Sequence, residues 1–320
     1  MIDQESIASY FENRVFPVIW EDWFLDILCE GGEWKFVEYK ENKELLGLWL
    51  YWQKKKLGLT YITMPPAVKY MGPVFKPDLS QAQKEKAYDY MSLMLPSSSY
   101  YVQQFLPELD SLKSVISTDK TVERTTFIWD LSPTMDELHQ ALDGNYRRAI
   151  RKYEESGGKL DDENLKQKST KAEIDALIEM LVSSMGPLEE HGISEMQLTK
   201  LIKAAESRSK GKLLVCRNHV EIIGASFIVW DKKRAYYLFA GNHKDHRKLY
   251  PGVLTVWKTA LFLKVHTTVK DLDLYGSSIE TIARVWKKIG AKEQSYLLVE
   301  NHPNRFFRLL QWGKNKWRGK

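Results

Sequence analysis

The second half of the chain restricts the possible folds through the order of its helical and strand-like segments. Capping boxes of Thr170 with Glu173 and of Ser194 with Gln197 each open a helix with apolar residues at helical spacing. Three strand-like runs follow, at 212–217, 220–230 and 234–240. A helix at 253–265, a strand at 270–274, a helix at 279–288 and a strand at 294–299 complete the series. The predicted order is α-α-β-β-β-α-β-α-β.

The first half repeats this plan in a less regular form. A helix at 21–30 ends at Gly31-Gly32, a C-terminal signal, and strands are expected at 34–39, 45–53 and 59–63. A Pro-rich loop at 64–77 precedes a helix at 80–94, strands at 100–105 and 124–130, and a helix capped by Ser132-Pro133. A bridging helix is expected at 145–155. We therefore predict an α+β protein with mixed sheets in two domains, 1–140 and 141–320.

The composition is that of an ordinary globular protein. Of 320 residues 43% are apolar and 28% are charged, which excludes a wholly disordered or fibrous chain. No apolar run is long enough to cross a bilayer, and the first residues include Asp3 and Glu5 rather than a basic signal segment. Cys29 and Cys216 lie in apolar stretches, where buried free thiols are expected. These features predict a cytoplasmic location.

The positive charge is concentrated at the C-terminus. The net charge is +5, but residues 305–320 carry six basic side chains and no acid, which leaves −1 for the rest of the chain. Phe306, Phe307, Trp312 and Trp317 are interleaved with these charges. Such a tail suits tRNA or other RNA phosphates, or an anionic membrane surface. A solvated final helix whose rings pack on the domain is the alternative.

Several common catalytic and nucleotide-binding motifs are absent from the sequence. It contains no G-x-x-x-x-G-K-S/T, G-x-G-x-x-G, G-x-S-x-G or C-x-x-C. His243 and His246, with Asp245 between them, form the one metal-like cluster. Because the sequence shows no further ligand near them, we interpret this segment as a solvated loop and predict no metal site.

Three segments resemble those of a known family when taken together in order. They are Thr63-Met-Pro-Pro-Ala-Val-Lys-Tyr-Met-Gly-Pro-Val74, Phe239-Ala-Gly-Asn242 with Tyr250-Pro-Gly-Val-Leu-Thr-Val-Trp257, and Asp271-Leu-Asp-Leu-Tyr-Gly-Ser277 with Lys287-Lys-Ile-Gly-Ala291. The set is similar to FemAB-like, or BioF2-like, acyltransferases of the GNAT (general N-acetyltransferase) superfamily. The resemblance implies tandem GNAT-like domains, the N-terminal one degenerate. It also implies transfer of an acyl or aminoacyl group to an amine, from a thioester or a charged tRNA.

The sequence departs from the family pattern at two places. Fem-type proteins often carry a lysine where this chain has Trp286. The GNAT pyrophosphate signature R/Q-x-x-G-x-G/A is replaced by Arg247-Lys-Leu-Tyr-Pro-Gly252. In the Fem branch the acceptor is the stem peptide of a cell-wall precursor, and those enzymes often insert a coiled-coil arm where residues 158–210 hold two ordinary helices.

The candidate catalytic residues lie near the end of the expected strand at 270–274. Asp273 and Tyr275 are two residues apart and are expected on one face, with Asp273 as base and Tyr275 as acid. A carboxylate that caps its turn or pairs with a neighbour is the alternative for Asp273. Tyr236 and Tyr237 point to opposite faces of the preceding strand. By resemblance Tyr237 is expected to share a cleft with Tyr275, and a core tyrosine is its alternative.

Candidate binding residues follow from charge and from helix starts. Arg247, Lys248 and the backbone N–H groups of Gly252 and Val253 precede or open a helix, which suits donor phosphates. For an anionic acceptor the candidates are Lys69, Tyr70, Gly72, Tyr146, Arg147 and Arg148. For Arg147, Arg148 and Arg151 the alternative is a solvated helix face.

The function predicted from these features is acyl transfer to an amine of a metabolite or cell-envelope precursor. The cosubstrate is an acyl-CoA or an aminoacyl-tRNA, and no permanently bound cofactor is expected. Aminoacyl transfer from tRNA to a peptidoglycan stem peptide is the alternative reaction. A non-catalytic nucleic-acid-binding or envelope-binding protein on the same fold is the alternative of another class.

Overall fold

The computed structural model describes residues 17–107, 109, 113, 116, 120–160, 166–276 and 280–301. The chain divides into two compact units that are each discontinuous in sequence. Unit 1 holds Leu28–Arg124 and the described residues from Ser295, and unit 2 holds the described residues up to Ile27 and Thr125–Gln294.

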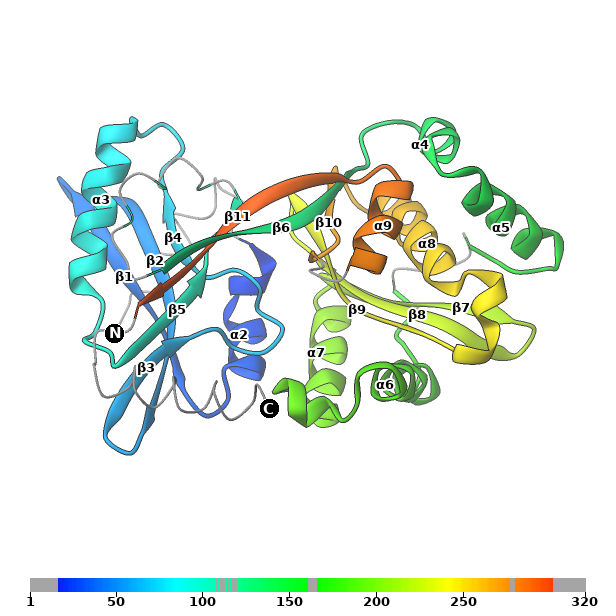
Figure 1. The fold of residues 1–320 in the computed structure, drawn as a ribbon, viewed down its shortest axis with the longest axis horizontal. Coiled ribbons are helices and arrows are strands. Elements are labelled where there is room, and N and C mark those ends of the chain that lie inside the picture. Colours follow the sequence, from blue (N-terminus) through cyan, green and yellow to red (C-terminus); the bar gives the residue numbers. More distant parts are fainter. Residues whose placement is uncertain are drawn as a thin grey trace. The chain divides into compact units, whose positions relative to one another are not determined.

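Unit 1 is a mixed sheet with one long helix packed on it (Figure 1). Its strands are β1 (Glu33–Glu41), β2 (Glu44–Lys56), β3 (Leu59–Thr63), β4 (Gly72–Phe75), β5 (Tyr100–Gln104) and the second part of β11 (Lys292–Asn301). They are ordered β1-β2-β3-β5-β11, and β4 pairs with β2. All pairs are antiparallel except β3 with β5. The helix α3 (Gln81–Met94) begins at a capping box of Ser80 with Gln83.

The core of unit 1 is built around Trp49. Its ring lies 5.1 Å from that of Tyr88 and 5.6 Å from that of Phe105, measured between centroids. The indole N–H donates to the side-chain oxygen of Gln103 at 2.7 Å, and the Gln103 amide donates to the Leu50 carbonyl at 2.9 Å. Gln103 is fully buried, so these bonds offset the cost of removing its amide from water.

The strands of unit 2 continue the same mixed sheet, and helices lie on both faces of this part (Figure 1). Its strands are ordered β6 (Lys120–Asp130), β10 (Asp271–Asp273), β9 (Arg234–Asn242), β8 (Glu221–Trp230) and β7 (Gly211–Asn218). The pairs are antiparallel except β10 with β9. The helix α8 (Pro251–His266) packs on β7, β8 and β9, and α6 (Lys171–Met185) packs on the same strands from the opposite face.

Shorter elements complete unit 2. They are η1 (Val18–Trp20), most of α2 (Asp22–Leu28), α4 (Met135–Ala141), α5 (Gly144–Glu155), η3 (Leu188–His191), α7 (Glu195–Ser207), η4 (Lys244–Leu249) and α9 (Glu280–Lys288). The first of these segments is tied to the sheet, because the Val18 N–H donates to the Asp231 carboxylate at 3.1 Å. The Lys210 ammonium contacts the Glu21 carboxylate at 2.6 Å.

The compact units do not follow a single division near residue 140. The end of β6 pairs with β10, where Asp130 faces Asp271, although the residues of this strand up to Arg124 belong to unit 1. Likewise β11 leaves unit 2 after Gln294, and its end pairs with β5 of unit 1. Each of these long strands therefore contributes to both units. The assignment of two consecutive domains, 1–140 and 141–320, stays a prediction.

Three local expectations differ from the structure. The Pro-rich segment expected as a loop contains β4, which pairs with β2 from Gly47 to Leu50. The helix expected to be capped by Ser132-Pro133 begins instead after Thr134, whose hydroxyl accepts the N–H of Glu137 in a capping box. The capping box satisfies two N–H groups at the helix start reciprocally, whereas a proline at the first position only removes one such group. The third difference is the end of β10, described below.

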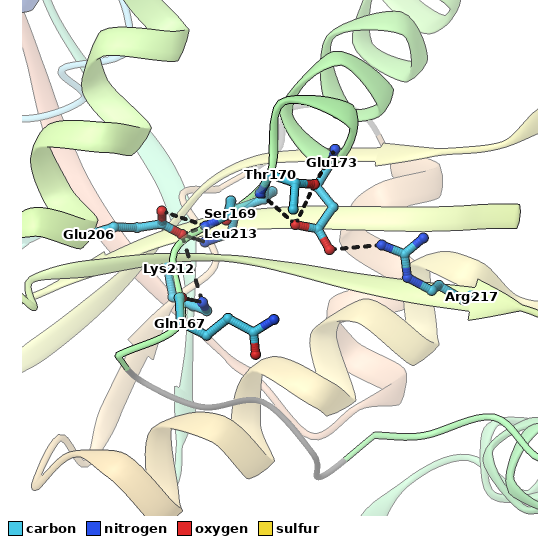
Figure 2. Close-up of polar contacts among 8 residues, drawn as sticks. All are labelled: Gln167, Ser169, Thr170, Glu173, Glu206, Lys212, Leu213 and Arg217. Atoms are coloured by element: carbon cyan, nitrogen blue, oxygen red, sulfur yellow. Dashed lines mark hydrogen bonds and ion pairs between the residues drawn. The ribbon is translucent and has the colours of Figure 1, made fainter. Parts of the chain in front are cut away.

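A buried polar cluster joins α6, α7 and β7 (Figure 2). The Glu206 carboxylate accepts the N–H of Ser169 at 3.0 Å and that of Leu213 at 3.3 Å, and lies 3.9 Å from the Lys212 ammonium. Lys212 is 2% exposed, and its ammonium also donates to the Gln167 carbonyl. Because both charged groups are out of water, each depends on the partners around it.

A partly exposed extension of this cluster fixes the start of α6 (Figure 2). The Thr170 hydroxyl accepts the N–H of Glu173, and the Glu173 carboxylate accepts the N–H of Thr170 at 2.8 Å and the guanidinium of Arg217 at 2.8 Å. Burial alone would raise the pKa of the Glu173 carboxyl, but these hydrogen bonds hold it below its usual value.

We predict that Glu206→Ala destabilises the protein by about 3–5 kcal/mol, because it leaves the Lys212 ammonium buried without its counter-charge. The free energy of unfolding from urea titration measures the loss. Glu179→Ala, at an exposed position of α6, is the control and should change stability by less than about 0.5 kcal/mol. Equal effects of the two substitutions would contradict the structural role of the cluster.

Candidate functional site

The parallel strands β9 and β10 run side by side for only a short distance. Their pairing extends from Asp271 opposite Arg234 to Asp273 opposite Tyr236. There β10 ends, whereas β9 continues to Asn242 while paired with β8 on its other edge. In β9 the register shifts between Tyr237 and Phe239. Ligands in open sheets with parallel strands bind where strands separate at their carboxyl ends. This point of unit 2 is therefore the candidate site.

A left-handed turn ends β10. Tyr275 has φ 59° and Gly276 has φ 63°, so the chain leaves the direction of the strand at once. The Asp273 carboxylate orders this turn, because its Oδ1 accepts the Tyr275 N–H at 2.8 Å and the Thr126 hydroxyl at 2.6 Å. The Leu274 N–H donates to the Phe127 carbonyl at 2.9 Å.

The expected strand at 270–274, with Asp273 and Tyr275 on one face, is thus corrected. Side chains alternate only while the backbone is extended, and Tyr275 is in the left-handed region. Asp273 is fully buried and its Oδ1 already accepts two bonds, which fits the alternative of a carboxylate that caps its own turn. Its role as a base stays a prediction.

The tyrosine that contacts Tyr275 is Tyr236, not Tyr237 as expected. The rings of Tyr236 and Tyr275 lie 6.1 Å apart, edge to face. Tyr237 points to the opposite face, where its ring lies 5.9 Å from that of Trp286. The alternation of side chains along β9 was predicted correctly. Which of the two faces of β9 meets the turn after β10 depends on how the two strands pair in the sheet. The alternation of residues along the sequence does not reveal this pairing.

Tyr237 belongs to a buried hydroxyl network between the sheet and α8. Its hydroxyl and that of Thr255 are 3.1 Å apart, and the Thr255 hydroxyl donates to the Gly252 carbonyl at 3.1 Å. Ser226 of the neighbouring strand β8 and Thr259 of α8 form a second pair, with 3.1 Å between their hydroxyl oxygens. Burial raises the pKa of the Tyr237 hydroxyl. These contacts fit a core tyrosine, the alternative interpretation.

The start of α8 offers fewer backbone donors than expected. Tyr250 precedes the helix with φ 55°, and its carbonyl accepts the N–H groups of Val253 at 2.9 Å and Leu254 at 3.1 Å. Pro251 has no N–H group. Of the two amides predicted to bind a phosphate, that of Val253 is therefore engaged, and that of Gly252 remains as the candidate. The Asn242 side chain lies against Gly252, since a Cβ there would be 3.2 Å from its Nδ2.

The basic candidates of the donor site lie directly before this helix. Arg247 and Lys248 are exposed residues of η4, the short segment that connects β9 to α8. They precede Pro251, the first residue of α8, by four and three residues along the chain, and a helix start carries a partial positive charge. A role of Arg247, Lys248 and Gly252 in donor binding stays a prediction.

The acceptor candidates of unit 1 lie beside β4. Tyr70 is fully buried and packs edge to face on Tyr296 with 5.4 Å between ring centroids. The Lys69 ammonium lies 4.9 Å from the centre of the Tyr296 ring. Gly72 has φ 132°, and a Cβ there would be 2.4 Å from the Phe105 ring. Packing and backbone conformation therefore explain this glycine without a ligand.

The acceptor candidates of unit 2 lie on α5. Tyr146 is buried, with its ring 6.1 Å from that of Tyr250 and the Lys288 ammonium 5.7 Å from its centre. Arg147 is exposed and donates to the Gln140 carbonyl at 2.6 Å, while Arg148 is exposed and donates to Asn145 at 3.3 Å. The arginine contacts fit a solvated helix face, and a role in binding stays a prediction for all six candidates.

Trp286 is a candidate that the sequence pattern did not identify. It lies on α9, is 9% exposed, and its indole N–H is buried without a hydrogen-bond partner in the part of the chain that the structure describes. An unsatisfied buried donor costs about 1–3 kcal/mol and commonly marks a place that a ligand or water occupies. In the sequence, this position was marked only because Trp286 stands where Fem-type proteins often carry a lysine.

Comparison with known proteins supports the fold and the class. Residues 143–288 match the family described as Acetyltransferase (GNAT) domain. None of the curated proteins matches the sequence. Among the described residues, no helix has both the length and the apolar character needed to cross a membrane. The basic tail at 305–320 lies outside the described residues.

Solved structures are similar over almost the whole chain. FemX has a TM-score of 0.65 at 11% identity and covers 97% of this chain and 98% of its own. L-PGS from Bacillus licheniformis has a TM-score of 0.50 at 11% identity, with 99% and 97% covered. A conserved protein of unknown function from Bacteroides thetaiotaomicron has a TM-score of 0.51 at 8% identity, with 87% and 89% covered.

These findings confirm the predicted α+β class and support acyl transfer as the class of reaction. The residues that match the family model include β9, α8 and β10. The chain therefore has the GNAT fold, and its resemblance to FemAB-like acyltransferases of the GNAT superfamily is confirmed.

Proposed function

We propose that the protein is an N-acyltransferase that moves an acyl group from a coenzyme A thioester to an amine of a metabolite or cell-envelope precursor. The observation that carries this proposal is the separation of β9 from β10 after Tyr236, from where β9 continues to Asn242 beside Gly252 at the start of α8. Residues 143–288, which match a GNAT acetyltransferase domain, contain both features.

Unit 2 offers suitable partners for both the pyrophosphate and the amide-containing arm of such a donor. Coenzyme A carries a pyrophosphate and an extended arm with amide groups. Beyond Tyr236 the edge of β9 presents backbone N–H and C=O groups at the spacing that an extended amide chain can pair with. Arg247, Lys248 and the Gly252 N–H suit the phosphates. In this arrangement the thioester lies near the turn at Tyr275.

The transfer needs one proton to leave the amine and one to reach the leaving sulfur. The amine lone pair attacks the thioester carbonyl carbon, a C–N bond forms, and the C–S bond breaks. Tyr275 donates its hydroxyl proton to the thiolate and regains a proton from the nitrogen, so that the enzyme is unchanged. Asp273 positions Tyr275 through the turn that it caps. Orientation of the two substrates supplies much of the remaining rate enhancement.

A second candidate is aminoacyl transfer from a charged tRNA to a peptidoglycan stem peptide. The observation that favours it is the similarity to FemX over 97% of this chain. The reacting carbonyl is then an ester, and a ribose oxygen takes the place of the sulfur as leaving group. The basic residues at 305–320 suit RNA phosphates.

Product analysis tests the proposal. We expect intact-mass spectrometry to detect an acylated amine after incubation of the protein with acetyl-CoA and a panel of amines. In a parallel incubation, charged tRNA with a stem peptide gives product only if the second candidate is right. Absence of product from both donors, together with salt-sensitive binding to RNA or anionic vesicles, would contradict both and favour a binding protein.

The proposed phosphate contacts predict a change in donor affinity. Arg247→Ala with Lys248→Ala should raise the KM for the CoA thioester about tenfold or more, because charge-assisted bonds to phosphate are lost, and should leave kcat within a factor of about three. Lys244→Ala, an exposed lysine of the same segment η4, is the matched control and should leave KM unchanged. Equal KM values in all three proteins would contradict this assignment.

The two tyrosines are distinguished by opposite expectations. Tyr275→Phe should lower kcat by about 100-fold, the contribution of a positioned acid, without a change in thermal stability. Tyr237→Phe should lower stability by about 1 kcal/mol through its lost hydroxyl bond and leave kcat near the wild-type value. Steady-state kinetics and thermal melts of both variants measure these effects. The reverse pattern would assign the acid role to Tyr237 instead of Tyr275.

A further inference from the structure

A second cluster of reactive side chains lies at the other end of β9. Glu221 is the first residue of β8, His243 follows the last residue of β9, and His246 lies in η4. Each of the three offers one ligand atom, and these atoms lie within 4.8 Å of one another. The Glu221 carboxylate is 2.9 Å from Nε2 of His246 and 3.6 Å from Nε2 of His243.

The backbone holds these three residues together. β8 and β9 pair up to Gly224 opposite Asn242, and the His243 N–H extends the pairing by donating to the Ile223 carbonyl at 2.9 Å. The chain then turns, with the His246 N–H donating to the His243 carbonyl at 3.3 Å. Glu221 is consequently placed beside both imidazoles, although it precedes His246 by 25 residues.

We propose that Glu221, His243 and His246 bind a divalent transition metal ion of the zinc class. Two imidazole nitrogens and one carboxylate oxygen are a donor set that Zn²⁺ accepts, with water in the fourth position. Ligand atoms within 4.8 Å of one another need only small side-chain adjustments to meet one ion at about 2.0–2.2 Å. The Glu221 carboxylate lies between the two imidazoles, so the three side chains can direct lone pairs at one ion from three sides.

A fourth residue lies beside His243. Nδ1 of His243 accepts the Asp245 backbone N–H at 3.4 Å, and the Asp245 carboxylate is 3.9 Å from the same atom. When Nε2 of His243 binds an ion, Nδ1 carries the proton, and the Asp245 carboxylate is the nearby group that can accept it and orient the ring. The His243 and His246 side chains are 36% and 20% exposed, so both are partly fixed by packing while one side of the site stays open to water.

The position of the cluster suggests what the ion does. His243 and His246 bracket the beginning of η4, the segment that carries Arg247 and Lys248 to the start of α8. A bound ion would link this segment to the first residue of β8 and restrict its motion. That consequence for donor binding rests on the proposed function, whereas the metal site itself does not.

Metal titration of the 320-residue chain tests the site. After removal of metals with a chelator, we expect Zn²⁺ to bind with one ion per chain in calorimetry and to raise the melting temperature in a concentration-dependent way. Co²⁺ should give the visible absorption of a site with nitrogen and oxygen ligands. His246→Ala and Glu221→Gln should each weaken Zn²⁺ binding at least tenfold. His191→Ala removes an exposed histidine of η3 and should leave the binding unchanged.

Two results would overturn the assignment. One is the absence of Zn²⁺ binding by the metal-free protein at submillimolar concentration. The other is wild-type affinity in both His246→Ala and Glu221→Gln, which would assign the ion to other residues. Circular dichroism and cooperative melting of the metal-free variants establish that a lost signal reflects lost ligands and not unfolding. Because binding is measured without substrates, the test is independent of acyl transfer.

Discussion

The turn after β10 determines where the parallel pairing with β9 stops. A longer β10 would cover the edge of β9 with hydrogen bonds, and no extended ligand could then pair there. The left-handed conformation of Tyr275 and Gly276 prevents this continuation. It is an uncommon conformation for a tyrosine, and the bonds that Asp273 accepts from Thr126 and from the Tyr275 backbone stabilise it. The same buried carboxylate thus orders the turn at which β10 ends, and among the pairings of the described residues β9 continues beyond Tyr236 with β8.

Close packing on both faces of unit 2 keeps that edge in place. A Cβ at Gly224 of β8 would lie 2.9 Å from Thr255 of α8, and one at Gly241 of β9 would lie 2.5 Å from Met180 of α6. Helices on opposite faces therefore approach the backbone of neighbouring strands at positions where only glycine fits. This approach brings the start of α8, with Gly252 beside Asn242, next to the end of β9. The residues proposed to bind phosphate and the end of β9 therefore belong to one closely packed region of unit 2.

Features with local causes could be predicted from the sequence. The capping boxes of Thr170 and Ser194 open α6 and α7 as expected, because a cap depends on residues three positions apart. The order of strands and helices followed from periodicity in the same way.

Features that depend on distant residues were missed. The short strand β4 forms because β2 lies beside it, and the choice between Tyr236 and Tyr237 depends on which face meets the turn after β10. Glu221 could not be paired with His246 from spacing, since only the register of β8 with β9 brings them together. Likewise, the loss of the Val253 amide as a donor follows from the conformation of Tyr250.

Hydrogen exchange measured by mass spectrometry, with and without acetyl-CoA, tests most directly that the donor binds where β9 and β10 separate. The account predicts slower exchange in peptides that cover 237–242 and 250–254, because donor amides and phosphates engage the backbone groups there. Slower exchange confined to unit 1, or unchanged exchange in both peptides at a saturating concentration of the thioester, would contradict it.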